Sequence, residues 1–165
     1  MIFLGIGANL AGPGQPNALA TCEAALLTLP GVGIRMEARS PWYESEPVPS
    51  SGQPWYVNAV LRVGSDLAPD ALLTALHVVE ARFGRSRGSV NAARSLDLDL
   101  LDHQGRVSAE GEWPVLPHPR LHLRAFVLLP LRDLQPAWRH PRDDVPLSAL
   151  IAVLPGGQEI GRLAE

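Results

Sequence analysis

The sequence predicts an α+β fold in which helices pack on an antiparallel sheet. Strand and helix patterns follow one another in the order β, α, β, β, α, β, and further helical segments come after them. That order is the split βαβ arrangement of a ferredoxin-like core, with two helices on one face of the sheet. The later helices complete α/β/α layers. Neither an internal repeat nor a linker divides the chain, so we expect one domain over residues 1–165.

Length and cysteine content also bear on where such a chain functions. A chain of 165 residues can bury roughly 68–70% of its unfolded surface, so no disulfide or metal is needed for stability. Cys22 is the single cysteine, which is compatible with a reducing compartment. No apolar run reaches the ~18–20 residues of a membrane span. We therefore expect a cytoplasmic protein that does not contact a membrane, and we also expect it to be a monomer.

The charge pattern excludes several classes of function. The net charge is −3, and all 14 basic residues are Arg, because the chain contains no Lys. A P-loop nucleotide site and Schiff-base chemistry both need Lys, so both are excluded. A net negative chain also lacks the broad positive field that holds a nucleic-acid backbone. We therefore expect small-molecule substrates and no nucleic-acid partner.

The first half of the chain gives a strand, a helix and an extended segment. Residues 2–8 form an apolar run that predicts a buried strand. After Asn17, apolar residues recur at spacings of three and four, which predicts a helix that ends at Pro30. The following segment, 32–45, is expected to be extended, with Ile34, Met36 and Ala38 on one face. The Gly- and Pro-rich stretches 11–16 and 46–54 are expected to be loops.

The second half contains the clearest strand. Along residues 56–63, apolar and polar side chains alternate, which predicts one buried face. A helix is expected to begin at Pro69 and to end at Gly84. Residues 95–101 alternate again as a strand. The remaining elements are a segment over 124–134 that Pro130 interrupts and an amphipathic helix near 147–154.

Two aspartates on the strand 95–101 are the most informative residues. Side chains two apart on a strand share a face, and their Cα atoms lie ~6.6–6.8 Å apart. Asp97 and Asp99 therefore stand together, opposite the leucines that enter the core. Carboxylate oxygens without nearby His or Cys suit Mg²⁺, often as a bridge to nucleotide phosphates. Two solvated aspartates on an exposed face are the alternative.

Arginines precede this pair on a polar connection. Arg85, Arg87 and Arg94 lie within a dozen residues before the aspartates, on a Gly- and Ser-rich stretch. Guanidinium groups hold phosphate oxygens bidentately and stay charged at any working pH. Both a phosphate-plus-metal site and an ordinary solvated loop are consistent with this pattern.

A third group points to a planar ligand. Tyr56 and Asn58 share the non-core face of their strand. An aromatic ring can stack on a heterocycle while an amide reads its edge with one donor and one acceptor. His118 lies between two prolines and could donate to a phosphate, although a lone His is more often structural.

Together these motifs resemble the hydroxymethyl-dihydropterin pyrophosphokinase family. The resemblance covers the chain from Ile2 to about Leu154, and the R-x-L-D-L-D motif followed by P-H-P-R is its most specific part. The other matching stretches are Gly7-Ala8-Asn9-Leu10, Tyr43-Glu44-Ser45, Tyr56-Val57-Asn58-Ala59, Gly84-Arg85-Ser86-Arg87 and Arg124-Ala125-Phe126-Val127.

The resemblance implies an enzyme of folate biosynthesis. Such an enzyme transfers pyrophosphate from ATP to the hydroxymethyl group of 6-hydroxymethyl-7,8-dihydropterin and releases AMP. Two Mg²⁺ ions are expected on Asp97 and Asp99, and catalytic roles on Arg85, Arg94 and Asp97. The implied ATP-binding residues are Glu80, Arg85, Arg87, Arg94, Leu100, His118 and Arg124, and the implied pterin-binding residues are Ser45, Val48, Tyr56, Asn58 and Phe126.

Two other functions fit parts of the sequence. A nucleotidyltransferase places Gly-Ser before a D-x-D motif, but here Gly88-Ser89 lies closer to Asp97 than that pattern requires. A ferredoxin-like RNA-binding module needs aromatic pairs and a positive sheet face. Asp97 and Asp99 lie where an RNA backbone would pass, so the pyrophosphokinase remains the favoured hypothesis.

Overall fold

The core of the protein is a six-stranded antiparallel sheet. A computed structural model describes residues 1–84 and 95–164. The sheet order is β5-β1-β4-β3-β6, with β2 also paired to β4, and every pairing is antiparallel. The strands are β1 (Ile2–Ala8), β2 (Arg35–Arg39), β3 (Tyr43–Ser45), β4 (Tyr56–Gly64), β5 (Asp97–His103) and β6 (Ile160–Arg162).

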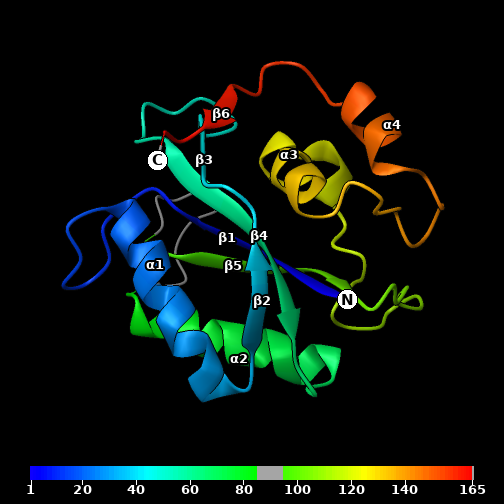
Figure 1. Ribbon diagram of the computed structural model, residues 1–165, viewed down its shortest axis with the longest axis horizontal. Helices are drawn as coiled ribbons and strands as arrows, with labels where there is room; N and C mark the ends of the chain where they lie inside the picture. Colours follow the sequence, from blue (N-terminus) through cyan, green and yellow to red (C-terminus); the bar gives the residue numbers. More distant parts are fainter. Residues whose placement is uncertain (85–94, 165) are drawn as a thin grey trace.

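Helices cover both faces of the sheet, as Figure 1 shows. One face packs against α1 (Ala18–Thr28) and α2 (Pro69–Arg82), which together bury Leu4 and Leu61 among other apolar residues. The opposite face packs against α3 (Ala125–Leu134) and α4 (Leu147–Ala152). Two short 3₁₀ helices complete the described elements, η1 (Leu29–Val32) and η2 (Leu121–Leu123). The ferredoxin-like order and the α/β/α layers predicted from the sequence are confirmed.

Local sequence signals explain where the two main helices begin and end. The side chain of Asn17 accepts a hydrogen bond from the Ala20 amide at 2.8 Å and so caps the start of α1. Helix α2 starts at Pro69, whose missing N–H costs nothing at that position. It ends before Gly84, whose φ of +82° needs a residue without a side chain. The predicted positions of both helices are confirmed.

The predicted extended segment 32–45 proved to be two strands. A bulge between Met36 and Ala38 shifts the pairing of β2 with β4. Met36 is 43% exposed. Beyond β2, the Ser40 hydroxyl accepts a hydrogen bond from the Val60 amide at 3.0 Å, and Pro41 follows without an N–H. The extended conformation predicted for this segment is confirmed, and it is divided between β2 and β3.

Pro130 does not interrupt α3, which runs through it. A proline inside a helix costs about 3 kcal/mol through a lost hydrogen bond and a steric clash. Here the helix buries Val127, Leu128 and Leu131 against the sheet. Burying three such side chains is worth about 1.5–3 kcal/mol each, which outweighs the cost of the proline.

The thiol of Cys22 is expected to be chemically inert in the folded protein. It is fully buried in α1, and burial, with a smaller contribution from the charge of Glu23, raises its pKa to about 12. Because the thiolate is the reactive form, a thiol reagent at pH 8 should label the native chain at least about 100-fold more slowly than the denatured chain. Labelling at equal rates would contradict the placement of Cys22 in the core.

None of the helices in residues 1–84 and 95–164 is long and apolar enough to cross a membrane.

Candidate active site

A cavity of about 410 Å³ opens on the sheet face that carries α3. Its floor is the middle of β1, where Gly5 and Gly7 point to this face and present no side chain. On either side, Gly7 pairs with Asp97 of β5 and with Asn58 of β4. Glycines on the central strand thus leave room for a ligand between the carboxylates and the amide.

Strand β5 carries the acidic wall of this cavity. Leu96, Leu98 and Leu100 pack into the core under α1 and α2, so Asp97 and Asp99 face the cavity, as the alternation predicts. The Asp99 Oδ2 atom accepts a hydrogen bond from Nη1 of Arg124 at 3.0 Å. Arg124 is the residue immediately before α3. The Asp99 side chain is 30% exposed, so it remains accessible to a ligand from the cavity.

His118 reaches the same carboxylate from a different segment. Its Nδ1 atom accepts a hydrogen bond from the Arg120 amide at 3.1 Å, so Nε2 carries the proton of the neutral ring. That Nε2 atom lies 3.9 Å from Asp99 Oδ2. Burial lowers the pKa of His118 below its ordinary value, with the charges of Arg124 and Arg120 acting in the same direction and Asp99 opposing them. The neutral ring therefore presents an N–H donor beside the acidic wall.

The opposite wall is suited to a planar polar molecule. The Asn58 side chain is 5% exposed, and its Nδ2 atom donates to Ser45 Oγ at 2.7 Å. This bond fixes the orientation of the amide on the sheet. Tyr56 of β4 and Phe126 of α3 line the same cavity, and the Arg124 guanidinium lies 5.3 Å from the centre of the Phe126 ring. Val48, on the loop after β3, also lines it.

The donor set fits a magnesium ion that phosphate oxygens help to bind. Within the described part of the chain, no three His, Cys, Asp or Glu residues are grouped so as to hold a metal by themselves. Asp97 and Asp99 supply two carboxylates. Mg²⁺ usually takes one or two carboxylates, several waters and the oxygens of a substrate phosphate, so this pair matches its requirements.

Most of the residues implied by the resemblance meet at this cavity. Asp97, Asp99, Arg124 and all five expected pterin-binding residues line it, and His118 contacts it through Asp99. Glu80 and Leu100 lie elsewhere: the Glu80 carboxylate accepts a hydrogen bond from the Leu98 amide at 2.7 Å, and Leu100 is in the core. The three arginines Arg85, Arg87 and Arg94 lie outside the described residues.

Several lining residues were not predicted from the sequence. They include Gly5, and also Pro155, Gly156 and Gln158 near the end of the chain. Gly5 could have been found, because it lies two residues before Gly7 and therefore on the same face. The C-terminal residues carry no motif, so only the tertiary structure brings them to the cavity.

Paired carboxylates, an arginine and aromatic rings in one cavity are the groups with which an enzyme can bind a phosphorylated co-substrate beside a planar molecule. Comparison with known proteins gives the family. The family described as 7,8-dihydro-6-hydroxymethylpterin-pyrophosphokinase (HPPK) matches residues 3–136. The chain belongs to this family.

Individual relatives agree with this assignment. A 2-amino-4-hydroxy-6-hydroxymethyldihydropteridine pyrophosphokinase of Pseudomonas aeruginosa is 38% identical over 93% of this chain and 91% of its own length. A protein of the same name from Synechocystis is 36% identical over 90% of this chain and 73% of its own length. The HPPK-DHPS protein of Plasmodium falciparum superposes with a TM-score of 0.68 at 14% identity, which shows the shared fold. That superposition covers 92% of this chain and 43% of the Plasmodium protein.

The floor of the cavity provides a sensitive test of the role expected for Asn58 in pterin binding. A Cβ atom added at Gly7 would lie 2.8 Å from Asn58 Oδ1, too close for both to stay in place. We therefore expect Gly7→Ala to displace the Asn58 amide and to raise the KM for the pterin about tenfold, an effect of the size that overpacking causes. Nucleotide affinity, measured by calorimetry, should change little.

Gly31→Ala is the matched control, because a Cβ at Gly31 has nothing within 4 Å. It should leave the pterin KM and the nucleotide affinity at their wild-type values. An unchanged pterin KM in Gly7→Ala would mean that Asn58 does not read the pterin in this orientation.

Proposed function

We propose that this cavity transfers pyrophosphate from ATP to the hydroxymethyl group of 6-hydroxymethyl-7,8-dihydropterin, with release of AMP. In this reaction the substrate hydroxyl oxygen forms a bond to the β-phosphorus of ATP. The bond between that phosphorus and the oxygen bridging to the α-phosphorus breaks, and this oxygen leaves with AMP. The chain is thus an ATP-dependent pyrophosphokinase of folate biosynthesis, as its family and relatives indicate.

The proposal depends on one observation: charged side chains and an amide with aromatic rings line opposite walls of the same cavity. Asp97, Asp99 and Arg124 bring charge for phosphates, while Asn58 and Phe126 bring an amide and a ring for a heterocycle. A group transfer between two substrates requires both to be bound with their reacting atoms adjacent, which alone can be worth several powers of ten in rate. A cavity with one kind of wall would suit binding of a single ligand.

The acidic wall is proposed to hold magnesium and the triphosphate. Asp97 and Asp99 would bind the metal, two ions in the arrangement we favour, and such ions neutralise phosphate charge and orient the phosphates. Arg124 and the Nε2–H group of His118 both lie near Asp99. Both would therefore be close enough to donate to oxygens of a triphosphate bound at this carboxylate. Asp97 would also be placed to accept the hydroxyl proton.

The other nucleotide-binding residues are proposed because the family resemblance implies them. Arg85 and Arg94 would stabilise charge that develops on the leaving and bridging oxygens, and Arg87 would bind ATP. Glu80 would support the site through its hydrogen bond to the Leu98 amide, which lies between the two aspartates. Leu100 would contribute through the core rather than through the cavity.

On the other wall, the pterin would lie between Tyr56 and Phe126. Its polar edge would meet Asn58, Ser45 and the backbone of Val48. We also propose that the chain forms one domain over residues 1–165, acts as a monomer and binds no nucleic acid, in keeping with its net charge of −3.

Product analysis tests the proposed reaction. The protein is incubated with ATP, Mg²⁺ and 6-hydroxymethyl-7,8-dihydropterin, and the nucleotide products are separated by chromatography. We expect AMP and a pyrophosphorylated pterin in equal amounts, and no product when EDTA removes the metal. Free pyrophosphate with an adenylated pterin would instead indicate a nucleotidyltransferase.

A further inference from the structure

The residues after Leu154 form part of the cavity although they lie beyond residues 3–136, the part of the chain that matches the family. The C-terminal segment, residues 155–163, runs from α4 back to the sheet and adds strand β6 to the edge of β3 (Figure 1). Pro155, Gly156 and Gln158 of this segment line the cavity. Gly157 has a φ of +77°, a conformation that lets the chain turn here toward α3.

Gln158 connects this segment to the start of α3 through three hydrogen bonds. Its Oε1 atom accepts from the Ala125 amide at 2.9 Å. Its Nε2 atom donates to the carbonyls of Leu123 and Pro155, each at 3.0 Å. The side chain cannot be reversed, because an amide N–H requires the oxygen and two carbonyls require the NH₂ group. Gln158 therefore holds the backbone on both sides of Arg124.

Two proposed substrate contacts depend on this stretch of backbone. Arg124 reaches Asp99 on the acidic wall, and Phe126, two residues later, forms part of the pterin wall. The residue before α3 has no side-chain cap of its own, so Gln158 satisfies an amide that the helix leaves open. A shift at Ala125 would move both groups at once.

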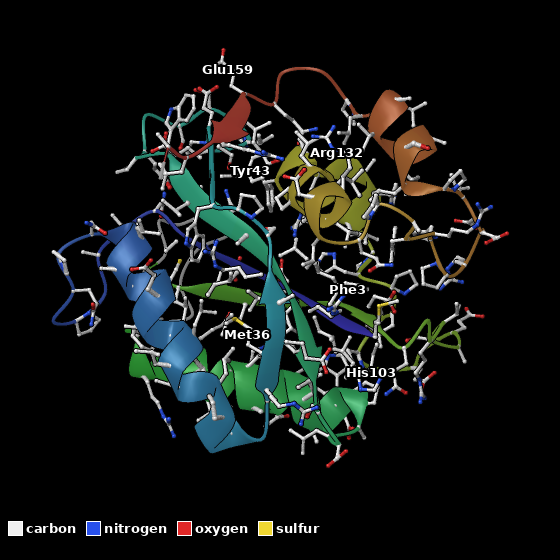
Figure 2. All side chains as sticks on the ribbon, viewed as in Figure 1. Phe3, Met36, Tyr43, His103, Arg132 and Glu159 are labelled. Carbon is white, nitrogen blue, oxygen red and sulfur yellow. The ribbon has the colours of Figure 1, made fainter. Side chains whose placement is uncertain are left out.

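The rest of the C-terminal segment is anchored independently of Gln158. Arg162 binds the Asp133 carboxylate at 2.8 Å, and the same carboxylate accepts a hydrogen bond from the buried Tyr43 hydroxyl. Figure 2 shows Tyr43 between β3 and α3, and Glu159 at the outer surface beyond them. The Glu46 amide also donates to the Glu159 carbonyl at 2.9 Å. The segment should therefore stay in place when the Gln158 side chain is removed.

We infer that Gln158 is a positioning residue that sets Arg124 and Phe126 for pyrophosphoryl transfer. The inference rests on the proposed function and adds a residue outside the family's matching region. Because Gln158 acts through both groups, its removal should affect both nucleotide turnover and pterin recognition.

Steady-state kinetics of Gln158→Ala provide the test. We expect kcat/KM for the pterin to fall between about 10-fold and 100-fold, the range that a small misplacement of substrate-binding groups produces. Both a lower kcat and a higher KM should contribute. Glu159→Ala, which removes an exposed neighbouring side chain on the same segment, should stay within about twofold of wild type.

A double-mutant cycle separates positioning from general destabilisation. In an Arg124→Ala background, Gln158→Ala should lower kcat/KM for the pterin by a clearly smaller factor than in the wild type. The reason is that one of the two side chains that Gln158 positions is already absent. A full additive loss, or kinetics equal to those of Glu159→Ala, would overturn the inference. A lower melting temperature with unchanged kcat/KM well below that temperature would show a merely structural role and also overturn it.

Gln158→Glu covers the case in which the alanine variant does not fold. It keeps an acceptor for the Ala125 amide but places a carboxylate against the carbonyls of Leu123 and Pro155. We expect a loss in kcat/KM smaller than that of Gln158→Ala. Wild-type kinetics in this variant would overturn the positioning role of Gln158. Absence of AMP production by the wild type would overturn the proposed function and this inference with it. Normal wild-type production with unaffected Gln158 variants would overturn the inference alone.

Discussion

Asp97→Asn is expected to lower kcat for pyrophosphoryl transfer by about a thousandfold while leaving the protein folded. The variant keeps the shape of the side chain and removes the charge that would bind magnesium beside the triphosphate. Metal stabilisation of phosphate charge is worth several kcal/mol, and about 4 kcal/mol corresponds to a thousandfold in rate. The measurement is AMP release at saturating ATP, pterin and Mg²⁺.

Stability should respond differently from activity in this variant. Two carboxylates on one strand face repel each other, so neutralising one of them removes an unfavourable interaction in the absence of metal. We expect the free energy of unfolding in metal-free buffer to stay within about 1 kcal/mol of wild type. Raising the Mg²⁺ concentration should stabilise the wild type in the presence of ATP but not the variant.

The exposed Asp66 gives the matched control. Asp66→Asn makes the same chemical change before α2, away from the residues that line the cavity, and should leave kcat unchanged. If Asp97→Asn retained turnover within tenfold of wild type at the same Mg²⁺ concentration, the metal role of this carboxylate would be wrong.

The acidic wall was predictable because strand alternation is a local property. Leu98 must enter the core, and the pleat then fixes Asp97 and Asp99 on the other face without any knowledge of the tertiary structure. Helix ends were predictable for a similar reason, since Asn17 and Gly84 act on their own backbone neighbours. These features need information from only a few adjacent residues.

Other features depend on contacts between distant segments and were missed. The bulge between Met36 and Ala38 arises from the pairing of β2 with β4, and no residue nearby signals it. Pro130 suggests a break, yet the buried face of α3 keeps the helix intact. Strand β6 has three residues, too few for a periodic pattern, so its pairing with β3 and the placement of Gln158 could not be predicted.

Asn58 should have the largest effect on recognition of the pterin. Its amide is buried, and Ser45 holds it by accepting one of its N–H groups at 2.7 Å. A site built to hydrogen-bond a polar edge discriminates strongly, because a ligand group left unpaired on burial costs about 1–3 kcal/mol. Asn58→Leu removes both the donor and the acceptor of this amide, so we expect it to raise the KM for the pterin about 100-fold or more.

Nucleotide binding provides the internal control for this variant, since Asn58 lies on the wall opposite the aspartates across Gly7. The Kd for a non-hydrolysable ATP analogue with Mg²⁺, measured by calorimetry, should remain within about threefold of wild type. The pterin KM of Ser45→Ala should lie between those of the wild type and Asn58→Leu. This variant frees the Asn58 amide to rotate but keeps its donor and acceptor. A pterin KM that rises in Ser45→Ala but not in Asn58→Leu would show that the hydroxyl, and not the amide, reads the pterin edge.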